Sequence, residues 1–239
     1  MYKKNPKTDG SGIICAIPQT GTCPNKCADY FFQSGRSYLE PLDENLPNIP
    51  SPLQGRGRVV RINDGNDSNI QRTKVESCAQ MYSDVFYNTA INKDLADFPG
   101  PVVLTINPGK DTDRAISLFT DPFPDNLIFV RFRANTWNLD LLKQAVSYYT
   151  HPEVPRQVPV IVTFMAYFQE SLPVKDAIFY TYRQRTLNSY WLLVLLNVKK
   201  LWMSIGIIPL YINVAKMVKP SLANVVETVF VNITTQKKG

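Results

Sequence analysis

The stretch of this chain that decides the fold class is residues 12–30, GIICAIPQTGTCPNKCADY. Its first part, residues 12–17, is an apolar run that a proline ends, and it predicts a buried β-strand. Cys23 and Cys27 follow, in the first two positions of a C-x3-C-x2-C loop, with Tyr30 where the third cysteine would stand. Three thiolates on such a loop hold three irons of a 4Fe-4S cluster and leave the fourth iron open to a ligand. The stretch therefore predicts a metal site at the carboxyl end of the first strand.

The chain from this loop to about residue 190 alternates between predicted strands and helices. Apolar runs rich in β-branched residues predict strands, and apolar residues spaced three or four apart predict helices. The predicted strands are 58–62, 101–106, 127–132 and 158–164. One predicted helix is capped by Ser68 or Asn69 and runs to about Tyr87, and a second, amphipathic helix runs from Leu139 to Tyr149.

Near-continuous apolar strands that alternate with helices are typical of an α/β fold with a parallel sheet covered on both faces. No Gly-x-Gly-x-x-Gly follows the first strand, so the pattern favours a partial or complete (β/α) barrel over a dinucleotide-binding sheet. Function then belongs at the carboxyl ends of the strands. Turn formation explains any one polar residue there, whereas the convergence of several indicates a binding site. The polar residues are Cys23 and Cys27, then Asn63, Asp64, Asn66 and Asp67, then Asn107, then Arg133 and Asn135, then Tyr167, Gln169 and Glu170.

Composition indicates an ordinary globular protein. A hydrophobic content of 44% with 19% charged residues argues against disorder. The net charge is +6, but the basic residues are scattered, so we expect a solvated surface and no nucleic-acid groove. The first ten residues, MYKKNPKTDG, lack the apolar core of a secretory signal. This predicts a cytoplasmic protein whose cysteines stay reduced.

A cysteine loop directly after the first strand of a β/α series resembles the radical S-adenosylmethionine superfamily. The longer stretch CPNKCADYFFQSGRSYLEPLDENLPNIP, residues 23–50, is similar to a small radical S-adenosylmethionine-like family of bacteriophages and some bacteria, and the resemblance covers residues 10–190. It implies a 4Fe-4S cluster, S-adenosylmethionine, and a reductant such as flavodoxin or ferredoxin, in the host cytoplasm if the protein is phage-encoded. Reductive cleavage would yield methionine and a 5'-deoxyadenosyl radical that abstracts hydrogen from an unknown substrate.

The resemblance also implies roles for individual residues. Cys23 and Cys27 would bind the cluster, with Tyr30 at the position of the third ligand. The loop after the second strand would hold the amino group of S-adenosylmethionine, through Asn63, Asp64, Asn66 and Asp67. Polar groups after the fourth and fifth strands would meet the ribose and carboxylate of this cofactor, through Arg133, Asn135 and Tyr167.

Tyr30 departs from the family pattern. A phenol is a hard oxygen ligand with a pKa near 10, so it substitutes poorly for a thiolate on iron. We therefore expect the radical reaction to be impaired. Cys15, in the first strand, and Cys78, in the first predicted helix, are expected to be buried structural thiols rather than replacement ligands.

The chain changes character at residue 191. We predict a radical S-adenosylmethionine-like β/α domain over residues 1–190 and an atypical, poorly ordered tail over 191–239. The apolar runs of the tail are split by Lys199 and Lys200 and are too short to cross a membrane, which takes about 20 residues. Asn-Val pairs at 197–198, 213–214 and 224–225 can encode cysteine in a shifted reading frame. We hypothesise that the tail is a frameshifted cysteine-rich segment, and Asn codons ending in C would contradict this.

Two alternatives to a radical enzyme stay open. The first is a degenerate, non-catalytic relative that keeps the barrel and binds a metal or a partner. The second is a small phage accessory protein that acts as a binding module, in which the cysteine loop is incidental. The single histidine, His151, precedes a proline in a predicted loop. A histidine-dependent triad, or zinc held by Cys23, Cys27 and His151, therefore has little support.

Overall fold

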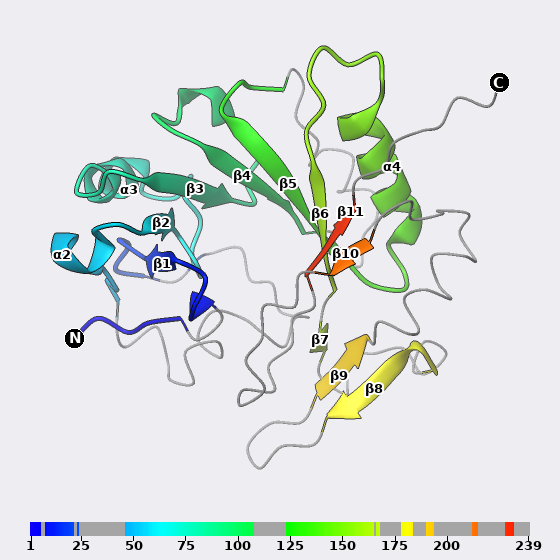
Figure 1. The fold of residues 1–239 in the computed structure, drawn as a ribbon, viewed down its shortest axis with the longest axis horizontal. Helices are drawn as coiled ribbons and strands as arrows, with labels where there is room; N and C mark the ends of the chain where they lie inside the picture. Colours follow the sequence, from blue (N-terminus) through cyan, green and yellow to red (C-terminus); the bar gives the residue numbers. More distant parts are fainter. Residues whose placement is uncertain are drawn as a thin grey trace. The chain divides into compact units, whose positions relative to one another are not determined.

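The computed structural model describes residues 1–5, 8–21, 23, 46–107, 123–164, 166–167, 178–183, 190–193, 212–214 and 228–231. These residues adopt an α/β fold, as predicted (Figure 1). The chain divides into two compact units. The first comprises residues 1–28, 32–105 and 120–128, and the second comprises 29–31, 106–119 and 129–239. None of the helices in the described part of the chain has the length and apolar character that a membrane span requires.

The sheet of the first unit is parallel. It contains β1 (Ile13–Ala16), β2 (Val59–Ile62), β3 (Val85–Thr89) and β4 (Val102–Ile106). Each strand pairs with the next one along the chain, in the order β1-β2-β3-β4. Consecutive parallel neighbours are the arrangement found in β/α barrels and in other singly wound sheets. All four carboxyl ends therefore lie along one edge of this sheet.

The helices in the described part of the first unit are short. They are α2 (Pro52–Gly55), α3 (Arg72–Ala79) and the 3-10 helix η3 (Leu95–Asp97). Ser51 and Gln54 form a capping box that starts α2. Helix α3 packs against β2 and buries Val75, Cys78 and Ala79.

The predicted helix from Ser68 or Asn69 to Tyr87 is wrong at both ends. Helix α3 starts at Arg72, after Gln71 in a left-handed conformation, and it ends at Ala79. A turn then leads into β3, which the sequence analysis missed. The β3 residues, VFYNT, are mostly β-branched or aromatic and favour a pleated, half-buried surface. The apolar residues of α3 and β3 follow one another so closely in the sequence that together they resemble the pattern of one longer helix.

The second unit contains a parallel pair and several antiparallel strands. Strand β5 (Leu127–Ala134) pairs in parallel with β6 (Val160–Phe164), and the amphipathic helix α4 (Leu139–Thr150) packs on β6. Strand β11 (Thr228–Val231) adds antiparallel to β6, and β10 (Ile212–Val214) adds antiparallel to β11. A separate antiparallel sheet has the order β7-β9-β8, formed by Ala166–Tyr167, Tyr190–Leu193 and Tyr180–Arg183. The described parts of residues 191–239 are thus strands.

Candidate functional site

The start of the cysteine loop is tied to the loop that follows β2. The amide nitrogen of Asn66 donates to the Gly21 carbonyl at 2.6 Å. From the other side, the amide nitrogen of Gln19 donates to the carbonyls of Asp67 and Ile70, both at 2.9 Å. Residues 19–21 follow β1 and residues 66–70 follow β2, so these bonds join the carboxyl ends of two neighbouring strands. Two segments that the sequence analysis placed at one edge are therefore in direct contact.

Asn63 begins the loop after β2 in a strained backbone conformation. Its φ is +67°, in the left-handed region that asparagine tolerates better than most residues. The Asn63 amide N–H donates to the Ala16 carbonyl at 2.7 Å, and its side-chain nitrogen donates to the Ser68 hydroxyl at 3.2 Å. The Ser68 hydroxyl in turn donates to the Ile62 carbonyl. Asn63 is fully buried, and its side chain helps to close the loop on itself.

Asp67 is a buried carboxylate that joins the β2 loop to the end of β3. Only 4% of the residue is exposed. One carboxylate oxygen accepts from the Thr89 hydroxyl at 2.6 Å and from the Asn69 N–H at 2.9 Å, and the other accepts from the Ala90 N–H at 2.6 Å. Burial raises the pKa of Asp67, and these hydrogen bonds partly oppose that shift. The side chain holds protein groups and is almost completely shielded from solvent.

Asp64 faces a different set of partners, on β1, β2 and the N-terminal segment. Its carboxylate pairs with the Arg61 guanidinium at 2.6 Å and accepts from the Asn5 amide. Arg61 stands opposite Cys15 in the register of β2 and β1. Burial, and secondarily the Asp64 charge, raise the pKa of the Cys15 thiol above its ordinary value. Cys15 is therefore a neutral buried thiol.

The described residues contain little of a metal site. Cys15 and Cys78 are both buried, as the sequence analysis predicted, and burial raises the pKa of Cys78 to about 11. Cys23 is half-buried in the cysteine loop, whereas Cys27 and Tyr30 lie outside the described residues. Within the part of the chain that the structure describes, no three His, Cys, Asp or Glu side chains are grouped to hold a metal ion.

The residues predicted after β5 and β6 belong to the second unit. Arg133 lies within β5 rather than after it, because β5 extends to Ala134. The Asn135 side chain accepts from the Trp137 N–H at 3.0 Å, and Asn138 bonds the backbone of Asn135 and Arg133. These bonds form the turn that starts α4. Tyr167 lies in β7, and its side chain is outside the described part.

Three residues of this edge were missed by the sequence analysis. Gln19, Asn69 and Thr89 are the partners that connect the loops. Asn69 was predicted only as a helix cap, but its side chain donates to the Thr89 hydroxyl and to the carbonyls of Ile91 and Lys93. The sequence did contain an indication, because Asn88 and Thr89 end the run VFYNT, which has the composition of a strand. A helix was predicted through Tyr87, so these two residues were not recognised as the end of a strand.

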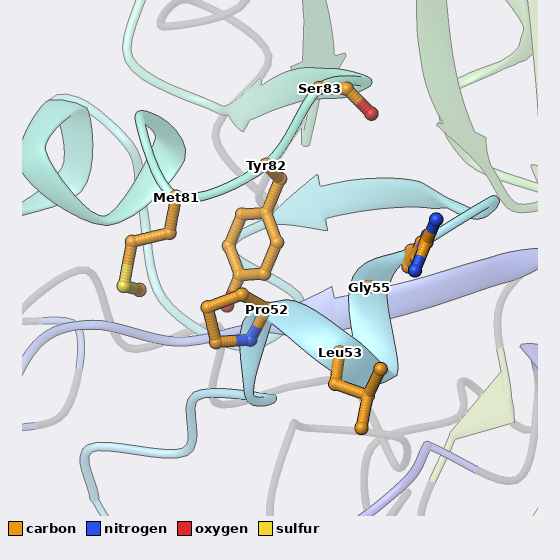
Figure 2. A pocket seen from close by; sticks show the side chains of 7 residues that line it. Pro52, Leu53, Gly55, Met81, Tyr82 and Ser83 are labelled. Atoms are coloured by element: carbon orange, nitrogen blue, oxygen red, sulfur yellow. The ribbon is translucent and has the colours of Figure 1, made fainter.

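A pocket of about 350 Å³ lies at the opposite edge of the first sheet. Its lining residues come from α2, which precedes β2, and from the turn that precedes β3, so it is at the amino ends of the strands (Figure 2). The Tyr82 ring extends toward α2, and its hydroxyl donates to the Pro50 carbonyl at 2.6 Å. Leu53 and Met81 beside it are exposed. This largely apolar pocket has none of the predicted site residues.

Replacing Gly55 with alanine is expected to destabilise the protein by about 1–3 kcal/mol, because overpacking forces the surrounding groups to move. A Cβ at Gly55 would lie 2.6 Å from Cδ1 of Tyr82. The ring is held by its bond to Pro50 and cannot easily move aside. Urea unfolding followed by circular dichroism measures the effect. Gly21→Ala is the matched control, since nothing lies within 4 Å of its Cβ, and an equal loss in both variants would contradict the contact.

No protein-family model matches the chain, and no curated protein and no solved structure matches it either. The site therefore has to be interpreted from its own residues.

Proposed function

We propose that this chain is an iron–sulfur protein of the radical S-adenosylmethionine type, in which Cys23 and Cys27 bind iron and Tyr30 impairs the radical reaction. The observation that carries the proposal is the bond from Asn66 to the Gly21 carbonyl, two residues before Cys23. It joins the segment that leads to Cys23 to a polar loop at the carboxyl ends of consecutive parallel strands. That edge is where β/α proteins bind their ligands. A partial (β/α) barrel is the corresponding fold proposal.

The donor set does not fit a catalytic cluster. A 4Fe-4S cluster with one open iron needs three thiolates, and the loop supplies two thiolates and a phenol. Cys15 and Cys78 are buried in β1 and α3, so neither replaces the third ligand. The proposed activity is therefore iron binding by two thiolates, with assembly of a full cluster prevented at Tyr30.

The polar loop also fits S-adenosylmethionine poorly. The side chains of Asn66 and Asp67 bond to protein groups, and Asp64 pairs with Arg61. Asp67 is buried, with donors on both of its carboxylate oxygens. An amino group of a cofactor would have to meet the Asn63 side-chain carbonyl or backbone carbonyls of this loop, or displace one of these bonds. The loop thus acts as a scaffold for the edge of the sheet.

Anaerobic reconstitution with iron and sulfide tests the proposal. The unsubstituted protein is expected to bind substoichiometric iron. Tyr30→Cys is expected to reach about four irons and four sulfides per chain, as a 4Fe-4S cluster requires. Cys23→Ser should lose iron in both backgrounds. Cys78→Ala is the control, because this buried thiol lies in α3 and its loss should leave iron binding unchanged.

A non-catalytic relative is the second candidate, and the occupied side chains of the β2 loop favour it. In such a protein the cysteine loop and the polar loop would persist as structure without a cofactor. If Tyr30→Cys binds no more iron than the original chain and shows no affinity for S-adenosylmethionine, the iron–sulfur proposal is wrong. A full cluster and S-adenosylmethionine binding in Tyr30→Cys would instead exclude the second candidate.

A further inference from the structure

Among the described residues at the carboxyl edge of β1 and β2, two buried carbonyl oxygens have no hydrogen-bond donor. They are Oε1 of Gln19 and Oδ1 of Asn63. Gln19 is 1% exposed and Asn63 is 0% exposed, so bulk water does not reach these atoms. Nearly all buried polar atoms of folded proteins have a partner. Two unpaired acceptors in neighbouring loops therefore indicate that something binds there.

The hydrogen bonds determine which atom of each amide is the oxygen. The other amide atom of Gln19 lies 2.9 Å from two carbonyl oxygens, those of Asp67 and Ile70, so it must be the donating nitrogen. The Ser68 hydroxyl donates to the Ile62 carbonyl, so the Asn63 atom beside this hydroxyl is also a nitrogen. Flipping the Gln19 amide would put acceptors in contact, and flipping the Asn63 amide would require the Ser68 hydroxyl to give up its bond to the Ile62 carbonyl. The unpaired atoms are therefore carbonyl oxygens.

Both amides are anchored on one loop, which also contains a buried negative charge. Gln19 bonds the Asp67 carbonyl, and Asn63 bonds Ser68, the next residue. The Asp67 carboxylate accepts hydrogen bonds from a hydroxyl and two backbone N–H groups. All three donors are neutral, and acceptance of three hydrogen bonds favours the ionised form of the carboxylate. Among the described residues, no lysine or arginine pairs with it. A buried carboxylate without a countercharge favours a cation nearby.

We propose that Oε1 of Gln19 and Oδ1 of Asn63 bind a monovalent metal cation, K⁺ or Na⁺, at the carboxyl edge of β1 and β2. Neutral carbonyl oxygens are hard ligands that replace the hydration shell of such ions. The single negative charge of Asp67, whose own oxygens are occupied, balances one positive charge rather than two. The cation would lock the β1 and β2 loops together. This site goes beyond the proposed iron–sulfur function and does not depend on it.

Thermal melting of the full chain in different salts tests the cation site. At equal ionic strength, KCl or NaCl is expected to raise Tm over choline chloride in a saturable way, by about 3–5 °C at ten times the dissociation constant. Asn63→Gly removes the carbonyl and suits the left-handed backbone, so it should abolish this difference. Gln71→Gly is the matched control, because Gln71 is an exposed amide with a φ of +52°, and it should keep the difference.

Asn63→Asp provides a second variant, and its extra negative charge is expected to enlarge the difference between potassium and choline. Three outcomes would overturn the site. The first is an equal Tm in potassium, sodium and choline, which would assign the two oxygens to buried water. The second is an undiminished difference in Asn63→Gly. The third is a rise with methylammonium as large as that with potassium, which would indicate an organic ammonium group instead of a metal ion.

Discussion

Asp67→Ala is expected to lower the free energy of unfolding by about 3–5 kcal/mol, because it leaves buried hydrogen-bond donors without an acceptor. The N–H groups of Asn69 and Ala90 lose their side-chain acceptor, and the Thr89 hydroxyl keeps only its longer bond to the Ile91 carbonyl, at 3.2 Å. Each buried unpaired donor costs about 1–3 kcal/mol, and release of the buried charge offsets part of the sum. Urea unfolding followed by far-ultraviolet circular dichroism measures the loss.

Asp67→Asn separates the hydrogen bonds from simple loss of volume. It keeps the size of the side chain but turns an amide nitrogen toward backbone N–H donors, so a loss of about 2 kcal/mol is expected. The control is Asp84→Ala, because Asp84 is exposed and an exposed substitution typically changes stability by less than about 0.5 kcal/mol. If Asp67→Ala proved as mild as Asp84→Ala, the carboxylate would not join the β2 loop to β3.

Phe132→Ala is expected to destabilise the second unit by about 3–5 kcal/mol, as large-to-small substitutions of buried aromatic residues do. Phe132 is fully buried on β5, and it stands opposite Val162 in the register of β5 and β6. The substitution removes apolar contacts and leaves a cavity in the core beside β6. Tryptophan fluorescence is a suitable probe, because Trp137, Trp191 and Trp202 all belong to the second unit.

Ile128→Ala is the control on the same strand, and its loss is measured by urea unfolding with circular dichroism, because Ile128 falls within the first unit. Ile128 is 41% exposed, so its truncation removes less buried surface and should cost under about 1 kcal/mol. Because β5 alternates buried and more exposed positions, the two variants also test its register. Equal losses at both positions would contradict the described orientation of this strand.

Long, strongly patterned segments could be predicted from the sequence. The apolar runs at 12–17, 58–62, 101–106, 127–132 and 158–164 match β1, β2, β4, β5 and β6, and the amphipathic run at 139–149 matches α4. Buried strands and amphipathic helices carry their pattern in local composition. The boundary between α3 and β3 could not be predicted in this way. Helix α3 has eight residues and β3 has five, with a short turn between them. Segments this short do not repeat often enough for the helical period of 3.6 residues to be told from the strand period of two.

The candidate site was only partly predictable. Polar residues after β1 and β2 were expected to share an edge. Asn66 and Asp67 do bond there to Gly21 and Gln19, which follow β1 but were not among the predicted residues, whereas Cys27 lies outside the described part. Their roles were not predictable, because a carboxylate that binds a ligand and one that binds its own backbone look the same in sequence. The difference lies in burial, which turns the Asp67 side chain inward onto Thr89 and Ala90.

The sequence by itself determined the α/β class, the strand that leads into the cysteine loop and the presence of Tyr30 in place of a third thiolate, since these depend on local pattern and residue identity. Only the tertiary structure decided that β1 to β4 are neighbours in chain order and that the Asn66 and Asp67 side chains of the polar loop bond to the protein itself. It also revealed the two unpaired carbonyls of Gln19 and Asn63. Hydrogen-bond satisfaction is a property of buried atoms from distant segments, so it exists only once the chain has folded.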